Sequence, residues 1–281
     1  MAQMSTTQLM DAALAMIGAT EAPADSVIDH PGTRIGHVLV GLDVDVAELF
    51  MARQLGYHAV LAYHPNGTRG RLARMDAMQH GARLLALGMD EAKIRALLDP
   101  RITRLQRAEA RMNPDRAGSV ARLLDLPFLT IHSPFGEVAR RTIQATVDAA
   151  LAAQPDATLR DLCEFLDVLA PFGNAPRPMP RPHAGWEARA GRVVVALGTY
   201  APPDAAIARA YFAQGVQTLC VADFAEADWH DLAQDELPGN IFILGEAASA
   251  SVGILPYVAD LRAQGIEVTT FAGVLGDAST P

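Results

Sequence analysis

The sequence predicts an α/β fold of two similar lobes, each a mainly parallel sheet flanked by helices. Short runs rich in β-branched residues alternate with helical patterns, which is typical of parallel strands joined by crossover helices. The segment 171–191 carries five prolines and no hydrophobic periodicity, which is typical of a stiff connector. Half of the 281 residues are hydrophobic, enough for two cores. We therefore predict a first lobe at 1–170, the connector, and a second lobe at 192–281.

The first lobe is expected to begin with an amphipathic helix, because Met10, Leu14 and Ile17 would share one helical face. The elements expected after it are a strand at 36–44, a helix at 46–55, a strand at 57–63, a helical insertion at about 69–124, a strand at 127–131, and helices at 138–153 and 158–170. Asp90 and Asp115 are expected at helix starts, where a short acceptor side chain satisfies free backbone N–H groups.

Breaks in the insertion are expected near 88–90, at 99–100 and at 113–114, where glycine or proline interrupts the helical pattern. The arginine-rich stretch 101–116 is expected to be a solvated helix face, or a subunit contact. The elements expected in the second lobe are strands at 192–197, 217–222, 240–244 and 267–271, and helices at 204–214, 225–232 and 250–264.

The composition argues against nucleic acids and membranes as partners. Lys and Arg total 23 against 32 Asp and Glu, and a net charge of -9 opposes attraction to phosphate backbones or anionic lipids. No apolar run is long enough to cross a bilayer, and the start of the chain lacks the basic segment of a secretory signal. Cys163 and Cys220 alone do not indicate a disulfide framework. We expect a cytoplasmic protein.

Candidate functional residues follow the expected strands. His64 follows LAY, His132 follows LTI, Glu246 follows ILG, and Asp43 ends VLVGLD. Ligands of open α/β sheets bind beyond the carboxyl ends of strands, and imidazole and carboxylate are ligands of first-row divalent metals. Two alternatives stay open: Asp43 caps the following helix, and His132 is structural.

The sequence contains none of the stronger local signatures of a hydrolase triad, a zinc protease or a nucleotide fold, such as G-x-S-x-G, H-E-x-x-H or G-x-G-x-x-G. The pattern GLDVDVAELFMARQLGYHAVLAYHPNG resembles instead the opening motif of the dinuclear metal-centre hexameric family. This family is also called NIF-three-like and is often labelled GTP cyclohydrolase 1 type 2. MNPDRAGSVARLLDLPFLTIHSPFGE and ILGEAASASVGILPYVADLRAQGIEVTTFAG resemble later segments of its helical-insertion branch, in order along the chain.

The resemblance implies a NIF-three-like fold, a ring of six subunits and two metal ions per site. The metal-site pattern has its first histidine at Tyr63 and its second at His64, its bridging aspartate at Gly136, its C-terminal histidine at Glu246 and its last carboxylate at Ala250. Only His64 is unchanged, so the paired site is expected to be depleted. What remains is one divalent transition metal (Zn, Fe or Mn) held by His64, Glu246 and a neighbour such as His132 or Tyr63, or no metal.

Three functions follow from these residues. The first is a metal-assisted hydrolase or related enzyme for a small polar substrate, heterocycles included, in a cleft between the lobes, with Glu246 or Asp43 moving protons. The second is a catalytically inactive, oligomeric binding or scaffold protein. The third is a metal-free enzyme that uses Tyr63 and Glu246 as an acid-base pair. The first and third functions require His64 and Glu246 to face each other in one cleft.

Overall fold

A computed structural model describes residues 2–65, 79–110, 113, 115–176, 178–180, 185–199, 201–234 and 239–277. The strands are β1 (Val27–His30), β2 (His37–Gly41), β3 (Ala59–Ala62), β4 (Phe128–Thr130), β5 (Met179–Pro180), β6 (Val193–Val195), β7 (Thr218–Val221), β8 (Asn240–Ile243) and β9 (Glu267–Phe271). The helices are α1 (Thr6–Ile17), α2 (Val46–Gln54), α4 (Glu91–Glu109), α5 (Arg116–Leu124), α6 (Ser133–Ala153), α7 (Leu159–Leu166), α8 (Ala170–Gly173), α9 (Ala205–Ala213), α10 (Glu226–Ala233) and α11 (Glu246–Ala263). Residues 79–86 are also helical.

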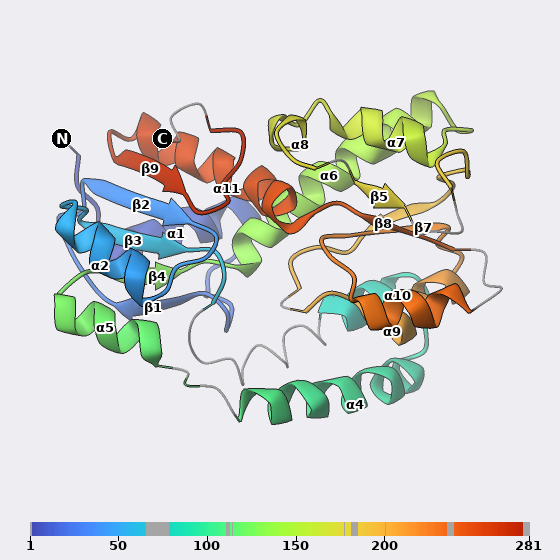
Figure 1. Cartoon of the computed structure of the whole chain (residues 1–281), viewed down its shortest axis with the longest axis horizontal. Coiled ribbons are helices and arrows are strands. Elements are labelled where there is room, and N and C mark those ends of the chain that lie inside the picture. The colour runs from blue at the N-terminus through green and yellow to red at the C-terminus, as the bar shows by residue number, and fades with distance from the viewer. Residues whose placement is uncertain are drawn as a thin grey trace.

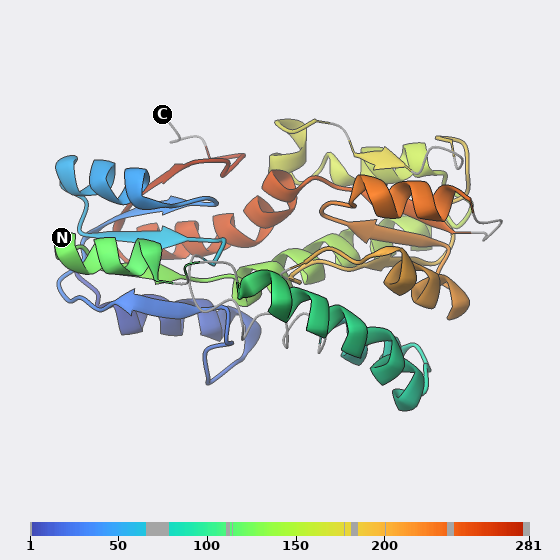
Figure 2. The same ribbon diagram turned by 60° about the horizontal axis from the view of Figure 1, so that its bottom comes forward.

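Within these residues the strands form two sheets, which confirms the predicted α/β fold with parallel sheets flanked by helices. One sheet has the order β1-β4-β3-β2-β9 and the other β5-β8-β7-β6. Pairing is parallel except at the edges β1 and β5. The two sheets lie side by side, and the long helices α6 and α11 run between them (Figures 1 and 2). These two helices pack against each other and so contribute to the contact between the two lobes.

The last strand lies in the first sheet, so the prediction that 267–271 completes the second lobe is wrong. β9 pairs in parallel with β2, with Val268 opposite Val38. The 18 residues of α11 separate β8 from β9. At 1.5 Å per residue this helix spans about 27 Å, enough to return the chain to the first lobe (Figure 1).

The proline-rich connector also takes part in a sheet. Within the expected connector 171–191, Met179–Pro180 forms β5, which pairs antiparallel with Phe242 and Ile243 of β8. Proline is accommodated there because an edge strand needs ladder bonds on one side only. Residues 177 and 181–184 of the connector lie outside the described residues.

The helical insertion follows a strand of the first sheet but packs against the second lobe (Figure 1). Leu84, Ile94 and Leu98 share a buried cluster with Ile207 and Tyr211 of α9. The expected break near 88–90 is confirmed: Gly88 has φ +99°, and the Asp90 side chain accepts hydrogen bonds from the first-turn amides of α4. Residues 69–78 of the expected insertion lie outside the described residues.

The expected break at 99–100 is wrong, because α4 continues through Pro100. An internal proline removes one backbone hydrogen bond, and here neighbouring contacts hold the helix to the second lobe. Arg101 is 7% exposed and donates to the carbonyl oxygens of Ala201 and Pro202 at 3.1 and 2.6 Å. It also pairs with Asp204 at 3.2 Å. Arg101 is therefore an exception to the solvated face predicted for most of these arginines, whereas Arg104 is 70% exposed.

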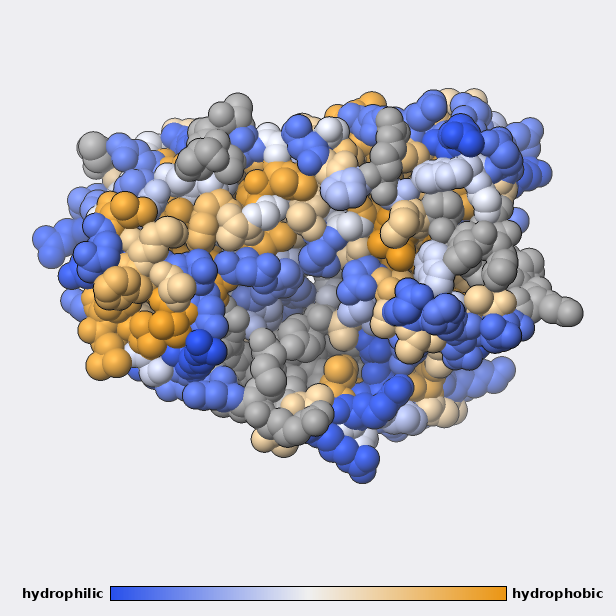
Figure 3. Space-filling model, viewed as in Figure 1, coloured by the Kyte–Doolittle hydropathy of each residue, from blue (hydrophilic) through white to orange (hydrophobic). Residues whose placement is uncertain are grey.

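Among the described residues, no helix combines the length and apolar composition needed to cross a bilayer. Hydrophobic residues do gather on the side of the first lobe where α2 lies (Figure 3). Phe50, Met51 and Leu55 are 56%, 39% and 64% exposed. We call these three residues the α2 patch.

Candidate functional site

Two of the candidate residues, His132 and Glu246, lie at the starts of the helices α6 and α11. α6 begins at Ser133, earlier than the expected 138, and His132 is its N-cap. Pro134 in the first turn suits this start, because a first-turn N–H has no helical partner. α11 begins at Glu246, earlier than the expected 250, directly after Gly245 with φ +91°. A positive φ is a conformation that glycine adopts without strain, so Gly245 allows the abrupt turn from β8 into α11.

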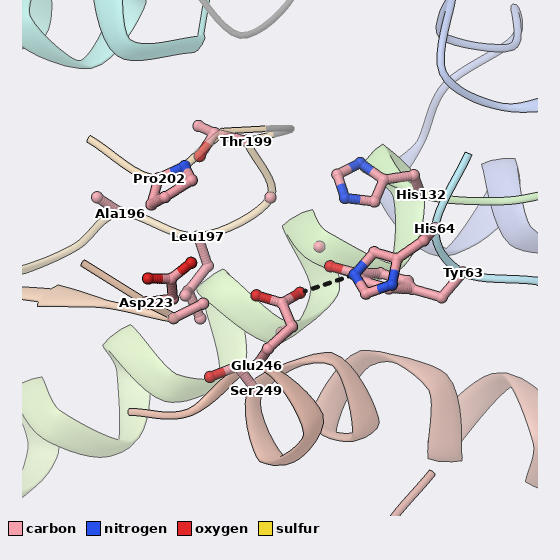
Figure 4. A pocket seen from close by; sticks show the side chains of 14 residues that line it. Tyr63, His64, His132, Ala196, Leu197, Thr199, Pro202, Asp223, Glu246 and Ser249 are labelled. Carbon is pink, nitrogen blue, oxygen red and sulfur yellow. Dashed lines mark hydrogen bonds and ion pairs between the residues drawn. The ribbon is translucent and has the colours of Figure 1, made fainter. Parts of the chain in front are cut away.

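A cavity of about 260 Å³ opens between the lobes at these helix starts. Its lining residues are Tyr63, His64, His132, Gly136, Ala139, Ala196, Leu197, Gly198, Thr199, Pro202, Ala222, Asp223, Glu246 and Ser249. Tyr63, His64 and His132 lie on one wall, Asp223 lies on the opposite wall, and Glu246 lies between them (Figure 4). The structure therefore brings together the histidines and Glu246, as the predicted functions required.

His64 links Asp43 to Glu246. Its Nδ1 lies 2.7 Å from Asp43 Oδ1, and its Nε2 lies 3.4 Å from Glu246 Oε1, a long hydrogen bond. The alternative role of Asp43 as a helix cap is wrong, because Asp45 is the N-cap of α2 and accepts from the amide of Val46 at 2.8 Å. Asp43 therefore contacts His64 and does not line the cavity.

Both ring nitrogens of His64 face carboxylates. Burial alone lowers the pKa of His64, but hydrogen bonds and charges from Glu246 and Asp43 outweigh burial, so the net effect raises its pKa. When both nitrogens donate, the ring is an imidazolium and offers no lone pair to a metal ion. The group between the carboxylates is then an internal cation.

We expect His64 to titrate above its ordinary pKa of about 6.5. In long-range ¹H–¹⁵N spectra, Glu246→Gln should lower this pKa, because one of its two anionic partners is removed.

The contacts of His64 with Asp43 and Glu246 stabilise the fold fully below about pH 6.5. This contribution to stability is lost as the pH rises through the raised pKa of His64. His37 is an internal control, because burial lowers its pKa. A His64 pKa at or below that of His37 would contradict the arrangement.

Tyr63 stays a neutral phenol. Its side chain is 4% exposed, and its hydroxyl points into the cavity toward Glu246 (Figure 4). Burial and the charges of Glu246 and Asp25 raise its pKa well above the ordinary value. At neutral pH the Tyr63 hydroxyl therefore keeps a proton that it can donate to a ligand, and it does not act as a base. In the predicted acid-base pair the role of base is then left to Glu246.

Asp25, which the sequence did not single out, holds His132. Asp25 Oδ2 lies 3.0 Å from His132 Nδ1, and the Asp25 carboxylate also accepts from the hydroxyls of Ser26 and Ser133. Burial raises the pKa of Asp25, but these hydrogen bonds and the charge of His132 lower it overall. With Nδ1 directed at Asp25, Nε2 is the ring nitrogen left to meet a ligand. No sequence signal pairs Asp25 with His132, which lies 107 residues away.

Asp223, also not singled out by the sequence, lies two residues after β7 and lines the cavity. Burial and the nearby charge of Glu246 raise its pKa. The rule that selected His64 and Glu246, a polar residue just beyond a strand, would have found it.

The geometry does not fit the paired metal site that the resemblance implies. A Cβ at Gly136, the position of the bridging carboxylate, would lie 2.4 Å from the Cα of Gly198. Ala250, the position of the last carboxylate, is 1% exposed and lies in the hydrophobic core of the first lobe. Among the described residues, no three His, Cys, Asp or Glu side chains form a group that could hold a metal ion. A side chain at Gly136 would clash with Gly198, and a carboxylate at Ala250 would be buried among apolar side chains.

Comparison with known proteins identifies structural relatives, whereas no family model and no curated protein matches the chain. A NIF3 superfamily protein from Sphaerobacter thermophilus is 34% identical, with 97% of this chain and 100% of that chain covered and a TM-score of 0.91. A Bacillus cereus protein related to NIF3 is 11% identical, covers 95% and 96%, and has a TM-score of 0.53. Reduced HcgD from Methanocaldococcus jannaschii is 9% identical, covers 96% and 98%, and has a TM-score of 0.58. The last two share the fold.

Proposed function

The chain belongs to the NIF3 superfamily, and from its interlobe cavity we propose that it is a metal-independent acid-base enzyme, a hydrolase of a small polar substrate. The observation that carries this proposal is the chain of contacts from Asp43 through His64 to Glu246, which ends on a cavity wall. A carboxylate oriented by a neighbouring imidazole beside a small cavity is suited to proton transfer. The predicted third function, with Glu246 as its central residue, is therefore the one we favour.

Glu246 is the catalytic residue in this proposal. Its carboxylate takes a proton from water as the water oxygen bonds to the electrophilic carbon of the substrate. It then gives that proton to the leaving group as the bond to that group breaks. The hydroxyl of Tyr63, which keeps its proton, donates a hydrogen bond to the substrate atom that receives the electron pair displaced by the incoming water oxygen. His64 and Asp43 are positioning residues, because they act through Glu246.

We expect Glu246→Gln to lower turnover by about 10²–10⁴-fold, because the amide cannot accept the proton. The assay incubates the protein with small polar amides, amidines and heterocycles in ¹⁸O-labelled water and detects water incorporation by mass spectrometry. Glu226→Gln on the exposed side of α10 is the matched control and should retain wild-type turnover. Equal turnover of wild type and Glu246→Gln would reject the proposal.

The metal-assisted reaction predicted from the sequence stays a prediction, as do zinc, iron or manganese as its metal. Elemental analysis of protein purified without chelator tests it. Stoichiometric metal that is lost in His64→Ala would favour the metal-assisted reaction over our proposal.

The inactive scaffold and the six-subunit ring also stay predictions. The exposed α2 patch supports self-association, because exposed apolar groups of this kind often mark contacts between proteins. The mass of the protein in solution tests this assembly.

A further inference from the structure

We infer that the cavity selects a small organic cation rich in N–H donors, of the guanidinium or amidinium class. This inference rests on the proposed function, since it names the substrate class of the same site. The inference is drawn from the polar atoms of the cavity wall, and it depends on whether each atom still has a proton to donate to a ligand.

The charged and ring atoms of the wall are acceptors. Asp223 and Glu246 contribute carboxylates from the second lobe, and the oxygen of Glu246 that does not face His64 remains available. When the His132 ring directs Nδ1–H at Asp25 and is neutral, its Nε2 is an acceptor on the other wall. Both ring nitrogens of His64 are directed at Asp43 and Glu246. A ligand therefore meets acceptors on both walls.

Among the described wall residues, two aliphatic hydroxyls add to this bias. Thr199 donates its proton to the carbonyl oxygen of Ala201 at 3.0 Å, and Ser249 donates to that of Gly245 at 2.7 Å. Each hydroxyl has one proton, so what both present to a ligand is oxygen lone pairs.

Tyr63 contributes a hydroxyl group that has no partner among the described residues. Its side chain is 4% exposed, its hydroxyl points into the cavity (Figure 4), and it makes no hydrogen bond to the described part of the chain. The lone pairs of the phenol oxygen are therefore open to an N–H group of a ligand.

Charge favours a cation over a neutral donor. Asp223 has no ion pair within the described residues, and burial together with the charge of Glu246 raises its pKa, which reflects repulsion between the two carboxylates. A planar cation between them would cancel this repulsion and direct N–H groups at both carboxylates. A cavity of about 260 Å³ limits the ligand to a small molecule.

Isothermal titration calorimetry with methylguanidine tests the inference on protein dialysed against EDTA. N-methylurea, which has a similar shape but no charge, and acetate, which is an anion, are the comparison probes. We expect methylguanidine to bind at least about tenfold more tightly than either, corresponding to about 1.4 kcal/mol. Asp223→Asn should weaken methylguanidine binding by at least about tenfold. The matched control Asp11→Asn, on the exposed side of α1, should leave it unchanged.

Equal binding of methylguanidine and N-methylurea, or unchanged affinity in Asp223→Asn, would overturn the inference. Binding of Zn²⁺ through Asp223 without any binding of methylguanidine would overturn it too, because the occupant would then be a metal ion. Calorimetry measures binding without turnover. A failure here therefore rejects the substrate class alone, whereas the Glu246→Gln assay decides the acid-base function separately.

Discussion

Gly136→Asp is expected to unfold at a much lower denaturant concentration than the wild type. A Cβ at this position would lie 2.4 Å from the Cα of Gly198, a backbone atom of the opposite lobe, so the lobes must separate to admit it. Overpacking alone costs about 1–3 kcal/mol, and an unpaired carboxylate at this buried position adds its desolvation. We expect a total loss of at least about 3 kcal/mol.

Gly173→Ala is the matched control, because nothing lies within 4 Å of the Cβ it would add and α8 has ordinary helical geometry there. Its stability should stay within about 0.5 kcal/mol of wild type. If urea unfolding gave Gly136→Asp the stability of this control, the close approach of the lobes at Gly198 would be wrong. Restoring the aspartate of the family pattern is thus expected to disrupt the fold instead of rebuilding a metal site.

Asp25→Ala is the second substitution with a large expected effect. Asp25 is 2% exposed, and its carboxylate accepts from the ring of His132, the hydroxyls of Ser26 and Ser133, and the amide of Ser133. Alanine leaves these buried donors without their acceptor, and breaking such a buried charged network costs about 3–5 kcal/mol. Urea unfolding measures this loss.

Asp115→Ala is the control for that measurement. Asp115 also holds a basic side chain, that of Arg122 at 2.6 and 2.8 Å, but both residues are exposed. Removing an exposed ion pair should cost at most about 1 kcal/mol. Equal losses in Asp25→Ala and Asp115→Ala would contradict the buried network.

The Asp25 contribution also has a predicted pH dependence. Because the pKa of Asp25 is lowered in the fold, its stabilising effect is complete above the unfolded value of about 3.9. The effect is lost as the pH falls through the lowered pKa. The stability difference between wild type and Asp25→Ala should therefore be largest near neutral pH and shrink in acid.

Most strands could be predicted from the sequence, because alternation of β-branched runs and helical patterns is a local property. The strands at His37–Gly41, Thr218–Val221 and Asn240–Ile243 lie inside their predicted ranges. Elements of few residues were missed: Val27–His30 and Met179–Pro180 have too few side chains to show a period, and both are antiparallel edges. Pro100 misled the prediction, because its local cost is smaller than the tertiary packing around α4.

The sequence by itself determined the α/β class and which polar residues follow strands, so the positions of His64, His132 and Glu246 along the chain were enough to select them. Tertiary structure alone decided that α11 returns the chain to β2, that Gly136 meets Gly198, and that Asp25 holds His132. These contacts join residues far apart along the chain. Local periodicity carries no record of such pairs, because they form only when distant segments of the chain pack against each other.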